Sequence, residues 1–234
     1  MELIDAHAHL QDEPGRAPDG GVLRVVSDGT RPEDWPRLLE LARAHEAVVP
    51  FFGLHPWYAA EAEGPWLASL EGFLDAVPSG VGEAGLDATR GEPAAQERAL
   101  RAQLDLARRR GLPVTLHCVR AWGRLQEALR RAGGLPAGFL LHAYGGSAEL
   151  VGRLGGLGAY FSFGAAQLRR GSAKTVRALR AVPAERLLLE TDGAGGPQAL
   201  REALAAAASL RGEPEAGLAR RLLRNARGFL GRLW

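Results

Sequence analysis

Short runs of apolar residues, each bounded by turn-forming residues, recur along the whole chain and predict eight β-strands. The predicted strands are Glu2–Leu10, Val22–Asp28, Ala47–Leu54, Gly80–Leu86, Pro113–Cys118, Gly138–His142, Ala159–Phe163 and Leu187–Thr191. Between these runs, apolar residues recur every three or four positions, which is the spacing of one helix face. The predicted helices are Pro32–Ala44, Gly64–Val77, Pro93–Arg110, Ala121–Ala132, Ser147–Leu154, Ser172–Ala181, Pro197–Leu210 and Glu215–Leu233.

Strands that alternate with helices are typical of a parallel sheet, and two folds share this pattern. A doubly wound sheet often carries a G-x-G-x-x-G loop after its first strand, and no such loop follows Leu10. About 29 residues per strand–helix unit, on a chain of 234 residues, suits a (β/α)8 barrel, whose usual length is ~250 residues. We therefore predict an α/β protein with a single domain over residues 1–234, a (β/α)8 TIM-type barrel that is regular or distorted.

The composition is that of a soluble globular protein. Hydrophobic residues make up 46% of the chain, and no apolar run is long enough to cross a membrane, so no membrane partner is expected. The net charge is only +2, and the cationic residues are arginines spread over many helices, with Lys174 as the one lysine. One cysteine, Cys118, excludes an internal disulfide, and no cationic, apolar leader precedes the first strand. We expect a cytoplasmic protein with no obligate protein partner.

The first predicted strand carries three polar residues in strict alternation, Asp5, His7 and His9. Because successive side chains on a strand point to opposite faces, all three are expected on one face. Two imidazoles with a carboxylate beside them could bind one cation from one side. The alternative is a pair of buried, hydrogen-bonded histidines at the end of a strand.

Further polar residues stand at the carboxyl ends of other predicted strands, where parallel barrels place their functional groups. The strand-end set is His7, His9, His55, Glu83, His117, His142 and Asp192. Of the histidines, only His45 lies away from the strand ends; it stands near the end of a helix, and we expect it on the surface. Converging on one mouth, the set could hold two divalent ions bridged by a carboxylate, for which Glu83 is the best-placed candidate. Imidazole-rich sites suit zinc, manganese or iron better than magnesium.

Seven short motifs in order along the chain resemble one enzyme family. They are D-A-H-A-H, G-L-H-P, G-E-A-G-L-D, P-V-T-L-H-C, L-H-A-Y-G-G, F-S-F-G and L-L-E-T-D. Together they closely resemble the TatD-type metal-dependent deoxyribonucleases, within the amidohydrolase-like metal-dependent hydrolases. The resemblance runs nearly end to end. It implies a two-metal-dependent hydrolase of phosphodiester bonds, with DNA as substrate and partner, in single strands or at ends.

The resemblance also implies roles for individual residues. It assigns the metal ligands His7, His9, Glu83, His117, His142 and Asp192. The first-strand pair and Asp192 would hold one ion, the other two histidines would hold the second, and Glu83 would lie between the two ions. Asp192 would also orient or deprotonate the attacking water, and His55 would contact the scissile phosphate. Glu190 and Asp87 would orient ligands. Zinc, manganese or magnesium are the expected ions.

Some segments depart from the family pattern. In the family, an arginine usually follows the histidine of the fifth strand by two residues. Here Arg120 stands three residues after His117, which leaves its role as a phosphate contact open. The loops Gln11–Gly20 and Gly193–Pro197 are short, and they border the expected substrate mouth. Two other functions therefore stay open. One is a metal-dependent amide, ester or lactone hydrolase, including aminoacyl-tRNA deacylation; the other is a non-catalytic nucleic-acid-binding barrel.

Two further residues near the expected site each allow two interpretations. Cys118 could be a metal ligand, but neighbours on a strand face opposite sides, so we predict a packed thiol turned away from His117. Trp57 follows His55-Pro56 directly and is either a packed side chain or a wall of the substrate site, where a base could stack on it.

Overall fold

The computed structural model describes residues 2–13, 20–62, 64–193 and 195–234. The strands are β1 (Leu3–Ala8), β2 (Val22–Asp28), β3 (Val48–Phe52), β4 (Gly80–Asp87), β5 (Val114–Val119), β6 (Phe139–Leu141), β7 (Ala159–Gly164) and β8 (Leu187–Glu190). The α-helices are α1 (Trp35–Ala44), α2 (Trp66–Ala76), α3 (Pro93–Arg110), α4 (Trp122–Arg131), α5 (Ala148–Gly155), α6 (Ala165–Arg170), α7 (Ala173–Ala181), α8 (Gly196–Arg211) and α9 (Glu215–Leu230). Short 3-10 helices are η1 (Leu10–Asp12), η2 (Pro56–Tyr58), η3 (Ala184–Arg186) and η4 (Gly231–Leu233).

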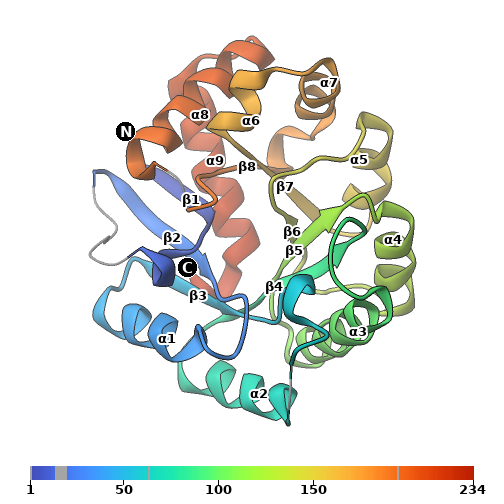
Figure 1. Cartoon of the computed structure of the whole chain (residues 1–234). Helices are drawn as coiled ribbons and strands as arrows, with labels where there is room; N and C mark the ends of the chain where they lie inside the picture. The colour runs from blue at the N-terminus through green and yellow to red at the C-terminus, as the bar shows by residue number, and fades with distance from the viewer. Residues whose placement is uncertain (1, 14–19, 63, 194) are drawn as a thin grey trace.

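The eight strands form one sheet in the order of the sequence, β1 to β8, and every pairing is parallel. The sheet curls until β8 lies beside β1, where the main-chain N–H of Asp192 donates to the oxygen of His7 at 3.0 Å. Helices surround the central strands (Figure 1). The predicted (β/α)8 barrel is therefore confirmed. Within the described ranges, no helix combines the length and the apolar character that crossing a membrane requires.

The predicted elements match the observed ones closely, with a few instructive differences. Helix α6 was not predicted, because its six residues are too few to show a periodic apolar stripe before Gly171 ends it. The last helix ends at Leu230 rather than Leu233, and Gly231 leads into a 3-10 turn. The loop predictions are tested only in part, because residues 14–19 and 194 lie outside the described residues.

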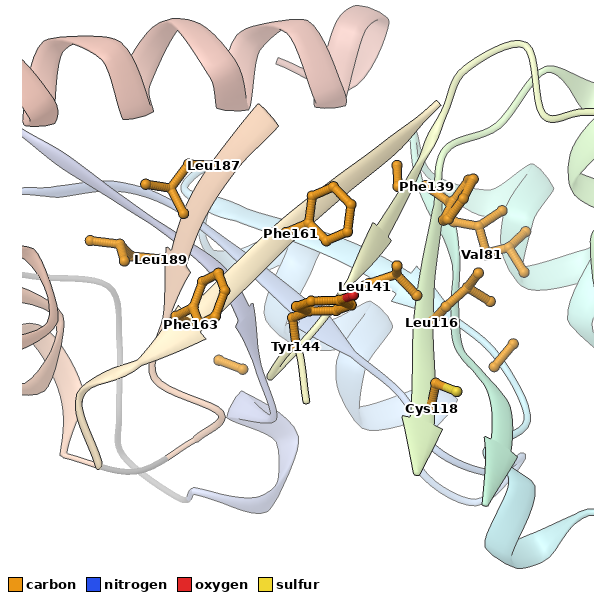
Figure 2. Packing of buried hydrophobic residues seen from close by; sticks show 14 of the residues in the cluster. Val81, Leu116, Cys118, Phe139, Leu141, Tyr144, Phe161, Phe163, Leu187 and Leu189 are labelled. Carbon is orange, nitrogen blue, oxygen red and sulfur yellow. The ribbon is translucent and has the colours of Figure 1, made fainter. Parts of the chain in front are cut away.

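One face of the strands packs against the surrounding helices and forms the larger apolar core. Figure 2 shows Leu116 and Cys118 of β5 in this layer, near Phe139 and Leu141 of β6. Cys118 is buried and unpaired, and its burial raises the pKa of the thiol to about 12. The prediction of a packed thiol is confirmed, and Cys118 is an inert part of the core.

The other face of the strands lines the interior of the barrel, which changes character along its length. At one end Val26, Leu140 and Leu188 belong to an apolar cluster that α9 covers with residues such as Phe229. Two positions further along the same strands come three polar residues, namely Asp28, His142 and Glu190. Residues two apart on a strand share a face. The interior is therefore apolar further toward the amino ends of the strands and polar at their carboxyl ends. Those polar ends form the mouth of the barrel.

Two buried glutamines of α3 attach this helix to the ends of β3 and β4. The Gln103 amide accepts from the main-chain N–H of Leu54 at 2.8 Å and donates to its oxygen at 3.1 Å. Gln96 makes the same pair of bonds with Asp87, at 2.9 and 3.1 Å. Each side-chain amide thus acts as one more main-chain partner, at positions beyond the pairing of β3 with β4. Leu54 precedes His55, so α3 fixes the main chain that carries a predicted site residue.

Replacing Gln103 by leucine should destabilise the protein by about 1–3 kcal/mol, because the buried N–H and oxygen of Leu54 would lose their partners. Urea unfolding followed by circular dichroism measures this loss. The control is Gln198→Leu on the exposed face of α8, which should change stability by less than about 0.5 kcal/mol. Equal stability of the two variants would contradict the prediction.

Candidate active site at the barrel mouth

Glu83 of β4 lies at the centre of the mouth, and its buried carboxylate faces imidazoles on both of its oxygens. Its Oε1 lies 2.9 Å from His117 Nδ1, 2.9 Å from His142 Nε2 and 3.2 Å from His55 Nε2. These three histidines come from the ends of β5, β6 and β3. Residues far apart in the sequence therefore converge on a single oxygen atom.

The second oxygen of Glu83 faces the two histidines of β1. Its Oε2 lies 3.5 Å from His7 Nε2 and 3.4 Å from His9 Nε2. Asp192, directly after β8, adds a second carboxylate, with Oδ1 at 3.4 Å from His7 Nε2 and 3.7 Å from His9 Nε2. Unlike the buried Glu83, the Asp192 side chain is 51% exposed. The structure thus brings together all seven strand-end residues, while their individual roles remain predictions.

The two carboxylates expected to orient ligands lie behind the histidines. Asp87 Oδ2 is 3.5 Å from His117 Nε2, and Glu190 Oε1 is 3.9 Å from His142 Nδ1. Glu190 is itself fixed, because it accepts from the main-chain N–H of Ala143 at 2.8 Å and from the Ser162 hydroxyl. Both positions are compatible with an orienting role, which stays a prediction.

Asp5 does not lie where the alternation of the first strand placed it. Its buried carboxylate accepts from the main-chain N–H of Thr191 at 2.9 Å and from the Thr191 hydroxyl at 2.6 Å. In the described part of the chain it belongs to none of the groups that could hold a metal ion. The pairing register of β1 with β2 shifts between Asp5 and Ala8, so strict alternation does not continue from Asp5 to the histidines. Asp5 holds the turn that precedes Asp192.

The sequence analysis missed one residue of the site, Asp28, the last residue of β2. Its Oδ2 lies 2.8 Å from His7 Nδ1, and its main-chain oxygen lies 2.7 Å from His9 Nδ1. A signal was present, because Asp28 is the last residue of a predicted strand, and most of the other site residues lie within one residue of such an end.

Opposite charges in the mouth determine the ionisation of its residues. Burial alone would raise the pKa of Glu83, but the imidazoles of His142 and His55 hold it well below its usual range. Burial would likewise lower the pKa of His7, which the carboxylate of Asp28 raises well above its usual value. For His55 burial prevails and lowers the pKa. The pKa of Asp192 is lowered by the neighbouring His7 imidazole, against its burial. Glu83 and Asp192 are thus ionised at neutral pH.

The donor atoms of the mouth fit a bound cation better than they fit one another. Within the described ranges, the buried atoms without a hydrogen-bond partner of good geometry include His7 Nε2 and Glu83 Oε1. Glu83 Oε1 has three imidazole nitrogens within 3.2 Å and still lacks a well-aligned hydrogen bond. Buried polar atoms are normally paired, so atoms that converge without pairing point to a missing partner. Imidazole nitrogens with carboxylate oxygens are the donor set of zinc and related divalent ions.

Trp57 and Arg120 border this cluster. The Trp57 indole N–H donates to Asp87 Oδ2 at 2.7 Å, and its half-buried ring lies 4.8 Å from the His55 ring, centre to centre. The Arg90 guanidinium lies 4.2 Å from the centre of the Trp57 ring. Arg120 is exposed, directly after β5. His45 caps the end of α1 and is partly exposed, which agrees with its predicted place outside the site.

The model of one protein family, described as TatD related DNase, matches residues 4–231. The chain belongs to this family. It is 31% identical to the uncharacterized metal-dependent hydrolase YjjV of Escherichia coli (strain K12), over 95% of each chain. It is 33% identical to the 3'-5' ssDNA/RNA exonuclease TatD of Pantoea ananatis (strain LMG 20103), over 92% of this chain and 91% of that one.

A solved structure supports the same conclusion for the fold. The crystal structure of YjjV, a TatD homolog from Escherichia coli K12, superposes with a TM-score of 0.86 at 31% identity and covers 97% of both chains. The predicted family, the barrel and the class of metal-dependent hydrolase are therefore confirmed. As a member of the TatD-related DNase family, the protein is expected to bind divalent ions at the mouth described above.

Divalent ions should stabilise the chelator-treated protein. At a hundredfold excess over Kd, binding adds about 2.7 kcal/mol, which corresponds to a rise in Tm of roughly 5–10 °C for a chain of this size. Differential scanning fluorimetry with zinc or manganese measures this rise. In Glu83→Gln, which keeps the shape and loses the charge, most of the rise should disappear. His45→Ala should retain it, and a rise that survives Glu83→Gln unchanged would contradict a cation held by Glu83.

Proposed function

We propose that this protein hydrolyses phosphodiester bonds in DNA, in single strands or at ends, with two divalent ions bound at the barrel mouth. The observation that carries the proposal is the convergence of five imidazoles on Glu83, with the half-exposed Asp192 beside them. The Pantoea relative, described as a 3'-5' ssDNA/RNA exonuclease, supports nucleic acid as the substrate class.

The proposed ligands fall into two groups that share Glu83. His7, His9 and Asp192 would hold one ion, because both imidazole Nε2 atoms face Asp192 Oδ1 and Glu83 Oε2. The second ion would be held by the pair that faces Glu83 Oε1, namely His117 and His142. Two such ions lower the pKa of a water molecule and neutralise charge on phosphoryl oxygens. Zinc, manganese and magnesium are the candidates.

The position of Asp192 supports a role as the acceptor of a proton from the attacking water. Its carboxylate is ionised because its pKa is lowered, so it can accept a proton at neutral pH. Its main chain is anchored by the bond from its N–H to His7, while half of its side chain reaches solvent at the mouth. Asp192 therefore combines a fixed backbone with an exposed acceptor. Among the candidate acids it is the one a substrate can reach directly.

The surroundings of His55 support a role as a hydrogen-bond donor to the substrate. Its Nδ1 accepts from the main-chain N–H of Trp57 at 3.2 Å, and its lowered pKa keeps the ring neutral. A neutral ring whose Nδ1 accepts must carry its proton on Nε2. This nitrogen lies at the mouth, 3.2 Å from Glu83 Oε1. A phosphate oxygen near Glu83 could accept from it, which supports the predicted phosphate contact.

Trp57 is the proposed wall of the substrate site. Its indole is fixed by Asp87, and the Arg90 guanidinium lies over the ring. An aromatic ring with a guanidinium over one face suits single strands, in which bases stack on rings or guanidinium groups and phosphates contact arginine. The position directly beside His55 would place a stacked base next to the reacting phosphate.

A nuclease assay across a metal series tests the proposal. The wild type should cleave single-stranded oligonucleotides with zinc, manganese or magnesium, and Asp192→Asn should lower kcat by about 10²–10⁴ because a proton acceptor is lost. Failure to cleave DNA with any of these ions, together with cleavage of a lactone, amide or aminoacyl-tRNA, would favour the alternative function, a metal-dependent amide, ester or lactone hydrolase. Oligonucleotide binding without cleavage of any substrate, unchanged by Asp192→Asn, would favour a non-catalytic barrel.

Trp57→Leu should raise KM for a single-stranded oligonucleotide by about tenfold or more and leave kcat nearly unchanged, because base stacking on an aromatic ring contributes about 1–3 kcal/mol. Steady-state kinetics on a labelled oligonucleotide separates the two constants. Trp66→Leu is the matched control, a partly buried tryptophan of α2 that packs against the core. A fall in kcat with constant KM would argue against the stacking role.

A further inference from the structure

Asp28 contacts both histidines of β1 through two different oxygen atoms. It ends β2, it is fully buried, and it faces the barrel interior beneath the mouth. Its side-chain Oδ2 lies 2.8 Å from His7 Nδ1, and its main-chain oxygen lies 2.7 Å from His9 Nδ1. Neither contact involves the ring nitrogens that face Glu83 and Asp192. The two contacts therefore act on the histidines from behind.

We propose that Asp28 is a positioning residue that fixes the proton of both rings on Nδ1 and so prepares both Nε2 atoms to bind the same ion. This inference rests on the proposed metal-dependent function. A main-chain oxygen can only accept, so His9 Nδ1 must carry a proton to meet it at 2.7 Å. On the other ring, the carboxylate oxygen Oδ2 of Asp28 accepts the proton of His7 Nδ1 at 2.8 Å. When such a ring binds a cation, Nε2 is the nitrogen that carries no proton and supplies the lone pair.

Both lone pairs are directed at the same two carboxylates. His7 Nε2 lies 3.5 Å from Glu83 Oε2 and 3.4 Å from Asp192 Oδ1, and His9 Nε2 lies 3.4 and 3.7 Å from the same atoms. The rings are nearly perpendicular, with an interplanar angle of 89°. Because the two rings approach one point from different directions, each ring must be held in its own orientation for both Nε2 atoms to face that point. Asp28 supplies a fixed acceptor to each of them.

The surroundings of Asp28 hold it in this position. The Gln11 side chain donates to the same main-chain oxygen at 2.8 Å, which leaves that oxygen little freedom. Across the interior, Gly82 of β4 lies so close that a Cβ there would come within 2.7 Å of Asp28 Oδ1. The next residue along β4 is Glu83. The glycine thus lets β4 approach Asp28 while it carries the central carboxylate into the mouth.

Zinc affinity and the state of the rings test the inference separately from nuclease activity. Asp28→Ala should weaken zinc binding about 10–100-fold by isothermal titration, as loss of a carboxylate behind a ligating histidine does. Asp28→Asn keeps an acceptor of the same shape and should recover part of the loss, and it serves if the alanine variant fails to fold. Thr115→Val is the control, because Thr115 is equally buried in the interior and its hydroxyl has no partner among the described residues. It should bind zinc within about twofold of the wild type.

Nitrogen-15 NMR of the histidine rings in the zinc-loaded protein gives the deciding measurement. In the wild type, His7 and His9 should both carry a proton on Nδ1. In Asp28→Ala, or in Asp28→Asn, only the His7 ring signals should change, because the main-chain oxygen that holds His9 remains. A proton on Nε2 of either wild-type ring, or unchanged zinc affinity in both Asp28 variants, would overturn the inference.

The outcomes separate this inference from the proposed function. A protein that binds zinc with the expected ring signals and cleaves no DNA would support the role of Asp28 and refute the proposed substrate. A wild type that binds no divalent ion would refute both. Normal nuclease activity with an unaltered His7 ring in the variants would refute only the role of Asp28.

Discussion

The burial of one carboxylate, that of Glu83, constrains the mouth of the barrel. An ionised carboxylate removed from water is costly unless positive groups and hydrogen-bond donors lie close to it. Here the histidines come from four different strand ends, β1, β3, β5 and β6, and Asp192 is added after β8. Only a closed barrel brings the carboxyl ends of so many strands to one point. The burial of the Glu83 carboxylate therefore depends on the closed barrel, which brings the surrounding histidines together.

The rest of the molecule keeps this mouth rigid. The interior below it is filled with apolar side chains and covered by α9, so the charged residues lie on a packed apolar layer. From the side, α3 reaches the ends of β3 and β4 through Gln103 and Gln96, each bound to main-chain atoms next to site residues. Such contacts fix main-chain positions, and side chains attached to a fixed main chain lose little freedom when they bind.

Sequence periodicity predicted the strands, the order of the fold and the strand-end residues, because these depend on local spacing and on which residues end each strand. It could not place Asp5 or find α6. Asp5 was misplaced because the register of β1 against β2 shifts before the histidines, and a shift in pairing leaves no mark on the alternation. Asp28 ends a predicted strand, but its contact with His9 uses a main-chain oxygen. Every residue has such an oxygen, so no pattern of side chains could reveal that contact.

Five histidines at one mouth need not share a role, and the pattern of residue types along the chain cannot distinguish them. What distinguishes them is the group that meets Nδ1. For His7 and His9 that group is an acceptor on Asp28, so Nε2 is left with a lone pair suited to a cation. For His55 it is the N–H of Trp57, so Nε2 carries the proton and suits a phosphate oxygen. Identical side chains within a few ångströms thus acquire opposite hydrogen-bonding character from the atoms behind them. Those atoms are the carboxylate and the main-chain oxygen of Asp28 for His7 and His9, and the main-chain N–H of Trp57 for His55.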